Sequence, residues 1–273
     1  MKILVCISKV PDTTTKISFD DSRTKLNTPN VQYIVNPSDE WYALVRALEI
    51  QEANAGTTVT LINVGGADSE PVIRKALAIG GDGAVRVDVE PTDSFQVADA
   101  IATYAKEQGF DLILTGKETI DGNSSVAGAM IAELLDLPYI TLANKVDIDG
   151  SGVKVERESE YGDQIIKAAF PVVISASKGV ADARIPNMRG IMAARSKPVT
   201  VVAYSGQPLT SVESYSLPPE KGAVKMIAAE NAEELINLYT PKLKLYNYVS
   251  ISFFRNIKRK SKESIARGGF LRC

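Results

Sequence analysis

Residues 111–128 read DLILTGKETIDGNSSVAG, and this stretch decides the fold. Its apolar opening, 111–117, predicts a buried strand, and the small and polar residues that follow predict a loop. The apolar segment 124–138 predicts a helix that ends before a proline. A strand, a small-residue loop and a helix in this order are typical of α/β folds that bind ligands where their strands end.

The same alternation of strands and helices runs along the first half of the chain. Strands are expected at 2–8, 58–66, 84–90 and 111–117, and helices at 38–55, 69–80, 94–109 and 124–138. Strands that alternate with helices form βαβ units, so we expect an α/β fold with a parallel, doubly wound sheet.

The pattern changes in the second half of the chain. Two β-rich segments flank Gly150-Ser151-Gly152 and predict an added β-hairpin, and 164–177 predicts a further strand region. Residues 179–198 are rich in Gly, Pro, Arg and Met without a period, which predicts a long exposed loop. An extended C-terminal arm is expected at 199–228, followed by a short helix at 228–239.

The composition excludes several classes of enzyme. The 273 residues include no histidine, which removes Ser-His-Asp triads, Cys-His pairs and His-containing zinc sites. The two cysteines, Cys6 and Cys273, lie far apart and indicate a reducing compartment, and Cys6 is expected to be an inert core thiol. Asp12, Asp39 and Asp121 are expected to be turn and helix-start residues. We therefore predict neither a catalytic group nor a metal site.

Charge is distributed unevenly along the chain. Nine of the 31 Lys and Arg residues lie after residue 240, but only one of the 33 Asp and Glu residues does. The first 240 residues therefore contain 22 bases and 32 acids, a net charge of about −10. An acidic body is a poor surface for nucleic acid, and no apolar run of about 18 residues that would span a membrane occurs. The basic stretch 241–273 is expected to be disordered or the product of a reading-frame shift, with a tail that touches anionic membrane as the alternative.

Three polar or glycine-rich segments follow predicted strands: Cys6-Ile7-Ser8, Asn63-Val64-Gly65-Gly66, and 116–128. In an open parallel sheet they should meet at the carboxyl ends of the strands, where ligands bind. The loop 116–128 runs into a helix N-terminus whose free N–H groups suit a phosphate, and its two serines offer further donors. An alternative explains this composition equally well: Asn123 or Ser124 caps the helix, and no ligand binds.

Several motifs resemble the β subunit of electron transfer flavoproteins. They are VCISKVPDTTTK (5–16), NPSDE (36–40), GKETIDGNSSVAG (116–128), VERESEYGDQIIKAAFPVVIS (155–175) and RIPNMRGIMAARSK (184–197). The resemblance covers about residues 1–240, with the motifs in the order and at the spacing of the family. It implies an α/β fold of the adenine nucleotide hydrolase type that binds a structural AMP and helps an α subunit to hold the redox-active FAD.

By resemblance, the AMP site draws on the same strand-end segments. Its expected residues are Cys6, Asn36, Pro37, Ser38, Asp39, Val64, Ile120, Asp121, Gly122, Asn123, Ser124, Ser125, Val126, Ala127, Gly128 and Ala129. Homologues that bifurcate electrons bind a second FAD in place of AMP, and this alternative stays open. A stand-alone nucleotide-binding stress protein on the same fold is the third interpretation.

The resemblance also implies partners and a division of the chain. The segment around Met188 is similar to the family's recognition loop, which docks on acyl-CoA dehydrogenases or other flavin dehydrogenases. The expected docking residues are Arg184, Ile185, Met188, Arg189 and Ile191. A quinone reductase would accept the electrons, as in fatty acid β-oxidation. We expect a cytoplasmic bacterial heterodimer in which 1–198 is the nucleotide-binding domain with its recognition loop at 179–198, and 199–240 is an arm that contacts the α subunit.

Overall fold

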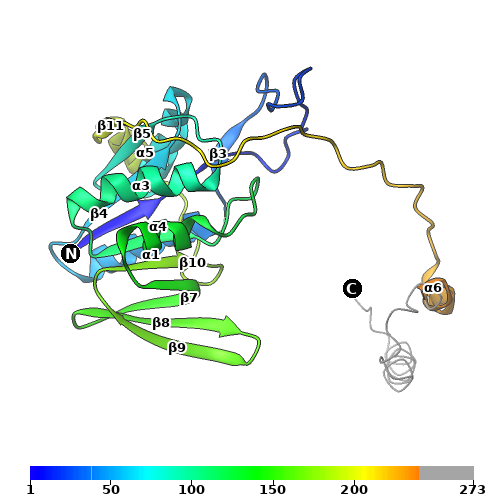
Figure 1. The fold of residues 1–273 in the computed structure, drawn as a ribbon. Coiled ribbons are helices and arrows are strands. Elements are labelled where there is room, and N and C mark those ends of the chain that lie inside the picture. The colour runs from blue at the N-terminus through cyan, green and yellow to red at the C-terminus, as the bar shows by residue number, and fades with distance from the viewer. Residues whose placement is uncertain (38, 240–273) are drawn as a thin grey trace. The chain divides into compact units, whose positions relative to one another are not determined.

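The structure, a computed structural model, describes residues 1–37 and 39–239. Its contacts divide the chain into two compact units, Met1–Leu217 and Pro218–Cys273. The first unit contains a nine-stranded sheet (Figure 1). Its strands are β1 (Lys2–Cys6), β4 (Thr58–Val64), β5 (Gly83–Asp88), β6 (Leu112–Gly116), β7 (Tyr139–Asp149), β8 (Gly152–Ser159), β9 (Gly162–Ala169), β10 (Val172–Ala176) and β11 (Val199–Ala203).

The order of the strands places a reversal at the centre of the sheet. The order is β11-β5-β4-β1-β6-β10-β7-β8-β9, and every pairing from β11 to β7 is parallel. The chain fills one side of β1 with β4 and β5 before it crosses to β6 on the other side. The expected parallel, doubly wound sheet is confirmed, and the β1–β6 boundary is the place where such sheets bind ligands.

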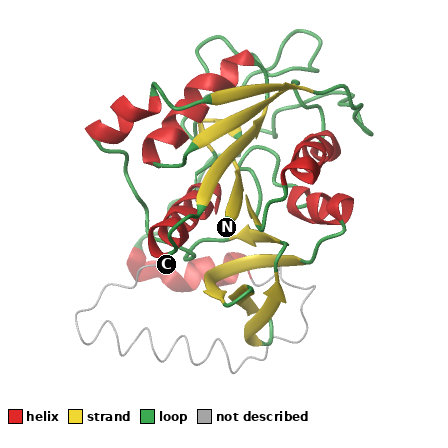
Figure 2. Cartoon of the chain, turned by 90° about the vertical axis from the view of Figure 1, so that its left-hand side faces the viewer, coloured by secondary structure: helices red, strands yellow, loops and turns green. Residues whose placement is uncertain are grey.

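Helices cover both faces of this sheet (Figure 2). Those of the first unit are α1 (Asp39–Ala53), α2 (Glu70–Ile79), α3 (Ser94–Gln108), α4 (Ala127–Leu135) and α5 (Met188–Ala194). Alternate residues of β1 point to opposite faces, so Ile3 and Val5 join the core under α1 and α2, while Leu4 joins the core under α3 and α4. Burial on both faces explains why these strands read as continuous apolar runs.

The added hairpin extends the sheet beyond its parallel part. β7 pairs with β8 and β8 with β9, both antiparallel, and the turn at residues 150–151 joins the first pair as the glycines predicted. A separate antiparallel pair, β2 (Lys9–Pro11) and β3 (Tyr33–Val35), follows β1. This pair brings the chain from the end of β1 to the start of α1.

The helix expected at 124–138 begins later, at Ala127, and neither Asn123 nor Ser124 caps it. The N-cap is Val126, whose side chain makes no capping hydrogen bond. Asn123 and Ser125 have φ angles of 47° and 55°, in the left-handed region, so the chain is still turning where the sequence pattern predicts a helix. Of the two alternatives for this loop, a cap by Asn123 or Ser124 is therefore wrong, and the first turn of α4 is left without a side-chain acceptor.

Three further regions contain more regular structure than the sequence pattern indicated. The region 164–177 forms two strands: β9 pairs with β8, whereas β10 lies between β6 and β7. The loop 179–198 contains α5, which begins after Asn187, whose side chain accepts a hydrogen bond from the N–H of Gly190 at 2.8 Å. The arm expected from residue 199 opens with β11, which pairs with the edge of the sheet at β5.

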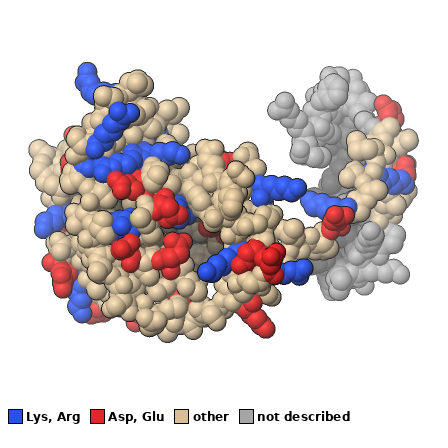
Figure 3. Space-filling model, turned by 90° about the horizontal axis from the view of Figure 1, so that it is seen from above, with Lys and Arg blue, Asp and Glu red and all other residues tan. Residues whose placement is uncertain are grey.

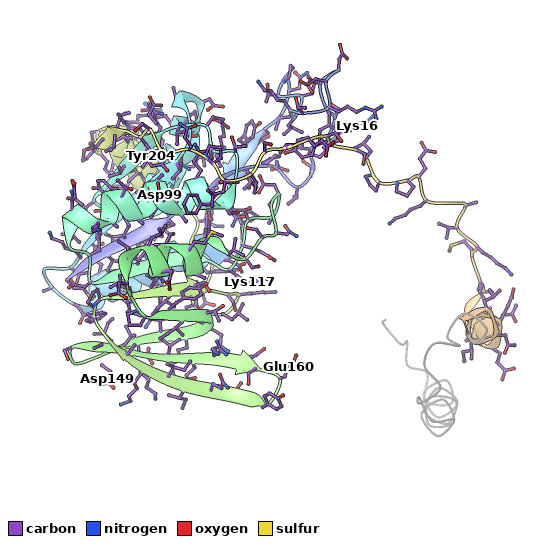
Figure 4. The ribbon with its side chains drawn as sticks, in the orientation of Figure 1. Lys16, Asp99, Lys117, Asp149, Glu160 and Tyr204 are labelled. Carbon is purple, nitrogen blue, oxygen red and sulfur yellow. The ribbon has the colours of Figure 1, made fainter. Side chains whose placement is uncertain are left out.

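The segment after β11 is held against α3. The hydroxyl of Tyr204 donates to Asp99 at 2.6 Å, and the two side chains meet in Figure 4. One carboxylate oxygen of Asp93 accepts from the N–H groups of Leu209 and Thr210, each at 2.8 Å. The start of the arm is thus part of the first unit.

The described part of the second unit contains one α-helix. This helix, α6 (Ala232–Tyr239), follows a 3₁₀ turn, η2 (Ala229–Asn231), and confirms the helix expected at 228–239. An ion pair of 2.6 Å joins Lys225 to Glu234. The basic stretch 241–273 lies outside the described residues. Among the helices that are described, none has the length and apolar character needed to cross a membrane.

Candidate functional site

Asn36 joins the polar segments that follow the strands. Its side chain is fully buried. Its backbone N–H donates to the carbonyl of Ser8 (3.1 Å), its Nδ2 donates to the carbonyl of Glu118 (2.9 Å), and its Oδ1 accepts from the N–H of Ile120 (3.0 Å). The segment after β1, the start of the first helix and the loop after β6 therefore meet at one residue; the first and last of these were expected to meet from the strand pattern, and the helix start was expected from the resemblance.

The segment after β4 reaches the same place. The N–H of Ile7 donates to the carbonyl of Ile62 at 2.9 Å, and Nδ2 of Asn63 donates to the carbonyl of Ile7 at 2.9 Å. Asn63 is 1% exposed, and its Oδ1 has no hydrogen-bond partner in the described residues. A buried acceptor without a donor needs an explanation, and an amino or hydroxyl group of a ligand would supply one.

Glu40, the last residue of the NPSDE motif, also lies in this region but is not among the site residues expected from the sequence. Its carboxylate accepts from the N–H of Ser8 at 2.6 Å and from the Ser8 hydroxyl at 2.8 Å. Burial, opposed by these two bonds, raises the pKa of Glu40 to about 8. A signal was present: Glu40, Ala43 and Leu44 share the buried stripe of α1 at helical spacing. An acid on an apolar stripe indicates a buried, partnered carboxyl group.

Cys6 fits the expectation of an inert core thiol. Its side chain is buried in the core under α3 and α4. Burial, with a smaller contribution from the nearby Glu40 carboxylate, raises the pKa of this thiol far above its ordinary value. A neutral, buried thiol is a poor nucleophile.

The loop after β6 is held by its own polar groups. The N–H of Asn123 donates to the carbonyl of Thr119 at 2.9 Å, and the hydroxyl of Ser125 donates to Glu118 at 2.7 Å. The hydroxyl of Ser124 lies 3.0 Å from that of Ser94 at the start of α3. Both serine hydroxyls thus have protein partners, so the backbone N–H groups remain the principal donors that the loop offers.

The start of α4 has the character of an anion site. The first N–H groups of any helix lack intrahelical acceptors, and here Val126 provides no side-chain cap. Thr115 is 4% exposed, its hydroxyl has no partner among the described residues, and a Cβ on residue 128 would lie 2.9 Å from that hydroxyl. The unpaired N–H groups at this positive helix end fit a phosphate group, whereas the Thr115 hydroxyl lies on the core side of the helix.

The predicted AMP residues differ in how exposed they are to solvent. Asn36 and Gly128 are buried, and Asp39, Val64 and Ala127 are partly buried. Residues 120–126 and Ala129 are exposed, Pro37 is partly buried, and Ser38 lies outside the described residues. The structure therefore brings the described members of the set to one end of the sheet. Gly128 faces Thr115 and Tyr139, on the core side of the helix.

A cleft of about 780 Å³ opens beside the loop after β6. Its walls include Asp39 and Lys117 on one side and Arg157, Glu158 and Lys178 on the other. Figure 4 shows Lys117 and Glu160, a further lining residue, at the same end of the molecule and Asp149 at the opposite end of the hairpin. Burial raises the pKa of Asp39, and Lys117 opposes that rise. The cleft has the size of a ligand pocket and is lined by charges of both signs.

A second surface surrounds α5. Its apolar side chains are strongly exposed: Ile185 is 84% exposed, Met188 73%, Met192 58% and Ile191 40%. Arg184, one of the expected docking residues, forms a two-pronged ion pair with Glu52 at 2.7 and 3.2 Å. Exposed apolar groups in one place indicate a site of protein interaction.

Charge elsewhere on the surface is mixed. Figure 3 looks down on the molecule and shows Lys and Arg interspersed with Asp and Glu across the drawn face. In the described residues, no group of three or more acidic or cysteine side chains is arranged to hold a metal ion.

Comparison with known proteins identifies relatives along most of the chain. The family model of the electron transfer flavoprotein domain matches residues 24–206. The electron transfer flavoprotein subunit beta of Bacillus subtilis is 34% identical over 90% of this chain and 100% of its own length, and that of Homo sapiens is 32% identical over 86% and 95%. Subunit CarD of the caffeyl-CoA reductase-Etf complex of Acetobacterium woodii is 30% identical over 89% and 98%.

Proposed function

The chain belongs to the family of electron transfer flavoprotein β subunits, and we propose that it binds AMP at the strand-end site while helping an α subunit to hold FAD. In this role it is an electron carrier subunit without a catalytic group of its own. The observation that carries the AMP assignment is the convergence at Asn36, which fixes the loop after β6 beside the uncapped start of α4.

The protein residues would bind and orient the nucleotide. N–H groups at the start of α4 would hold the phosphate, and the Oδ1 atom of Asn63 is suited to accept a hydrogen bond from the remainder of the nucleotide. Asn36 and Glu40 would act indirectly, because they hydrogen-bond to the backbone of the segments that would contact the nucleotide. Glu118 and Asp121 add negative charge to the loop, so the phosphate would be held by backbone dipoles rather than by a cluster of bases.

We place the contact with the FAD of the α subunit at the cleft of about 780 Å³. Lys117 and Asp39 connect this cleft to the nucleotide loop, and Lys117, Arg157 and Lys178 bring positive charge that suits a pyrophosphate. FAD supplies the redox chemistry when it is bound, and the residues of this chain position it and limit access of water.

The partners follow from the second surface. The exposed side chains around Met188 would dock on acyl-CoA dehydrogenases or other flavin dehydrogenases, and a quinone reductase would accept the electrons. Such a protein would serve fatty acid β-oxidation in the cytoplasm of a bacterium. The arm at 199–240, beyond β11, would contact the α subunit.

The experiment is analysis of the nucleotides that copurify with the heterodimer after coexpression with its α subunit. We expect one AMP and one FAD for each heterodimer, released by denaturation and identified by chromatography and absorption spectrum. A second FAD in place of AMP would overturn the AMP assignment in favour of a bifurcating flavoprotein. ATP bound to a chain that purifies without an α subunit would overturn the electron-transfer role and indicate a stress-type protein.

A further inference from the structure

The helix α5 lies unusually close to α2. A Cβ on residue 190 would lie 2.3 Å from the backbone carbonyl oxygen of Ala78, so the observed approach requires glycine at this position. The side chain of Asn187 caps the first turn through the N–H of Gly190. A helix of seven residues is too short to be stable in isolation, so its geometry depends on these contacts with α2.

Arg74 of α2 holds the other end of α5. Its Nη1 donates to the carbonyl of Ala194 at 2.8 Å and to the carbonyl of Lys197 at 2.7 Å. Its Nε and Nη2 donate to Glu70 at 3.3 and 3.0 Å, which fixes the plane of the guanidinium group. Lys197 also bonds to α2, because its Nζ donates to the carbonyl of Leu77 at 3.1 Å. Both the end of α5 and the turn after it are therefore tied to α2.

These ties determine what α5 presents to solvent. Met188, Ile191 and Met192 stand at helical positions i, i+3 and i+4, so they share one face. A cleft of about 520 Å³ continues from Ile191 across α2, between Pro71 and Lys75 on that helix and Arg195 beyond α5. The apolar face and the cleft form one surface, built from two helices that are distant in sequence.

The charges around this surface define the kind of partner. Arg189 and Arg195 are exposed, and neither occurs among the ion pairs of the described residues. Arg184, by contrast, is already paired with Glu52. An apolar centre with unpaired bases at its rim fits a partner protein that has an apolar pocket bordered by carboxylates.

We propose that Arg74 is a positioning residue for docking: by binding the end of α5 to α2, it holds the apolar side chains of α5 in the single orientation that a partner recognises. The inference rests on the proposed docking function and extends the docking surface to α2. Arg74 also lines the cleft of about 520 Å³, but its Nη1 donates to two backbone carbonyls at the end of α5 and in the turn after it, and the proposed role is exercised through these two bonds. Without Arg74, α5 would sample more orientations, and docking would have to supply the free energy that orders it.

The test compares Arg74→Met with Arg46→Met in the heterodimer. Arg46 is a matched control, because it also leaves a helix to donate to a distant carbonyl, that of Val146 at 2.7 Å, and also pairs with an acid of its own helix, Glu49. Reduction of the flavoprotein by an acyl-CoA dehydrogenase gives the apparent KM and the maximal rate. We expect Arg74→Met to raise KM about tenfold, the equivalent of about one lost hydrogen bond, with an unchanged maximal rate, and Arg46→Met to change neither.

Two further variants separate the possible failures. Met188→Ala tests docking itself: if it raises KM and Arg74→Met does not, the docking function stands and the positioning role is wrong. If neither variant changes KM, both are wrong. Should Arg74→Met fail to assemble, Gly190→Ala moves α5 away from Ala78 without removing a charge, and an unchanged KM in that variant would overturn the inference.

Discussion

The strand-end site and the docking surface around α5 are built in opposite ways. At the strand-end site a buried polar side chain, Asn36, fixes backbone segments, and polar atoms such as Oδ1 of Asn63 lie within the core. Around α5 the side chains are apolar and face solvent, with Ile185 84% and Met188 73% exposed. A site that retains its ligand needs enclosed polar groups, whereas a surface that meets partners repeatedly needs an accessible apolar centre.

The difference also predicts how each region responds to mutation. Polar atoms in the strand-end site support the fold and the ligand together, so a change there should affect both. Side chains on α5 contribute little to the core, so a change there should affect recognition alone. Substitutions in the two regions therefore make it possible to separate nucleotide binding from docking.

The largest effect is expected for Asn36→Ala. It leaves the carbonyl of Glu118 and the N–H of Ile120 without their Asn36 partner, and because both bonds are only partly buried the cost is below the roughly 1–3 kcal/mol of a fully buried group. We expect a clear fall in the free energy of unfolding, measured in urea, and loss of AMP. Asn54→Ala is the control, because the Asn54 side chain, just after α1, bonds only to the carbonyl of Ile50 in that helix among the contacts described. Retention of both AMP and stability in Asn36→Ala would show that the segments are held by other means.

Met188→Ala should reveal the opposite behaviour. Truncation of a central interface side chain typically costs about 2 kcal/mol, or roughly thirtyfold in affinity. We expect the apparent KM for the donor dehydrogenase to rise while AMP content, FAD content and melting temperature stay at wild-type values. Leu209→Ala is a suitable comparison, since Leu209 is 71% exposed and lies on the segment after β11. Equal effects of the two variants would remove the special role of Met188.

Val126→Asp tests the anion site without disturbing the core. Val126 is 37% exposed and precedes the first turn of α4, where a carboxylate is compatible with the helix dipole but repels a phosphate. We expect AMP affinity to fall about tenfold, or about 1.4 kcal/mol, with an unchanged melting temperature. Val126→Ala, which adds neither a charge nor a capping oxygen, should keep AMP. Gly128 is less suitable, because a side chain there would collide with Thr115 and Tyr139 whether or not a nucleotide is bound.

The buried carboxyl group of Glu40 predicts that the free energy of unfolding depends on pH. Its pKa in the folded protein is about 8, above the ordinary value of 4.5, so the folded state binds the proton more tightly than the unfolded state. The free energy of unfolding should therefore decrease as pH rises from about 5 to 8 and level off above that. Glu40→Gln should remove this contribution, which a comparison of urea unfolding at several pH values would detect as a smaller slope. Identical slopes would indicate that Glu40 stays ionised throughout.

The same contrast explains what the sequence could and could not predict. Strands and helices that carry their own signals, such as β6 with its apolar run and α3, lie within a few residues of their expected positions. The start of α4 was missed because Ser125 has a positive φ angle that its residue type does not signal, while the positive φ of Asn123, a residue that tolerates this region, indicates a turn as readily as a cap. The short helix α5 was missed because Arg74, more than a hundred residues away, holds it in place.

The candidate site shows the same division. The convergence of the strand-end segments followed from strand order alone, since the ends of parallel strands lie at one edge. The link through Asn36 and the cleft beside Lys117 depend on contacts between distant segments, which no local pattern specifies. Glu40 falls between these two cases: its position on the apolar stripe of α1 predicts burial, but its partner Ser8 lies on a distant segment.

The most direct test of the account is the nucleotide content of three heterodimers purified in parallel: wild type, Asn36→Ala and Met188→Ala. Each is passed through gel filtration, denatured and analysed for AMP by chromatography. The account predicts one AMP per heterodimer in wild type and in Met188→Ala, and little or none in Asn36→Ala. Equal AMP in all three, or none in the wild type, would contradict the central claim that the site joined by Asn36 holds the nucleotide apart from the docking surface.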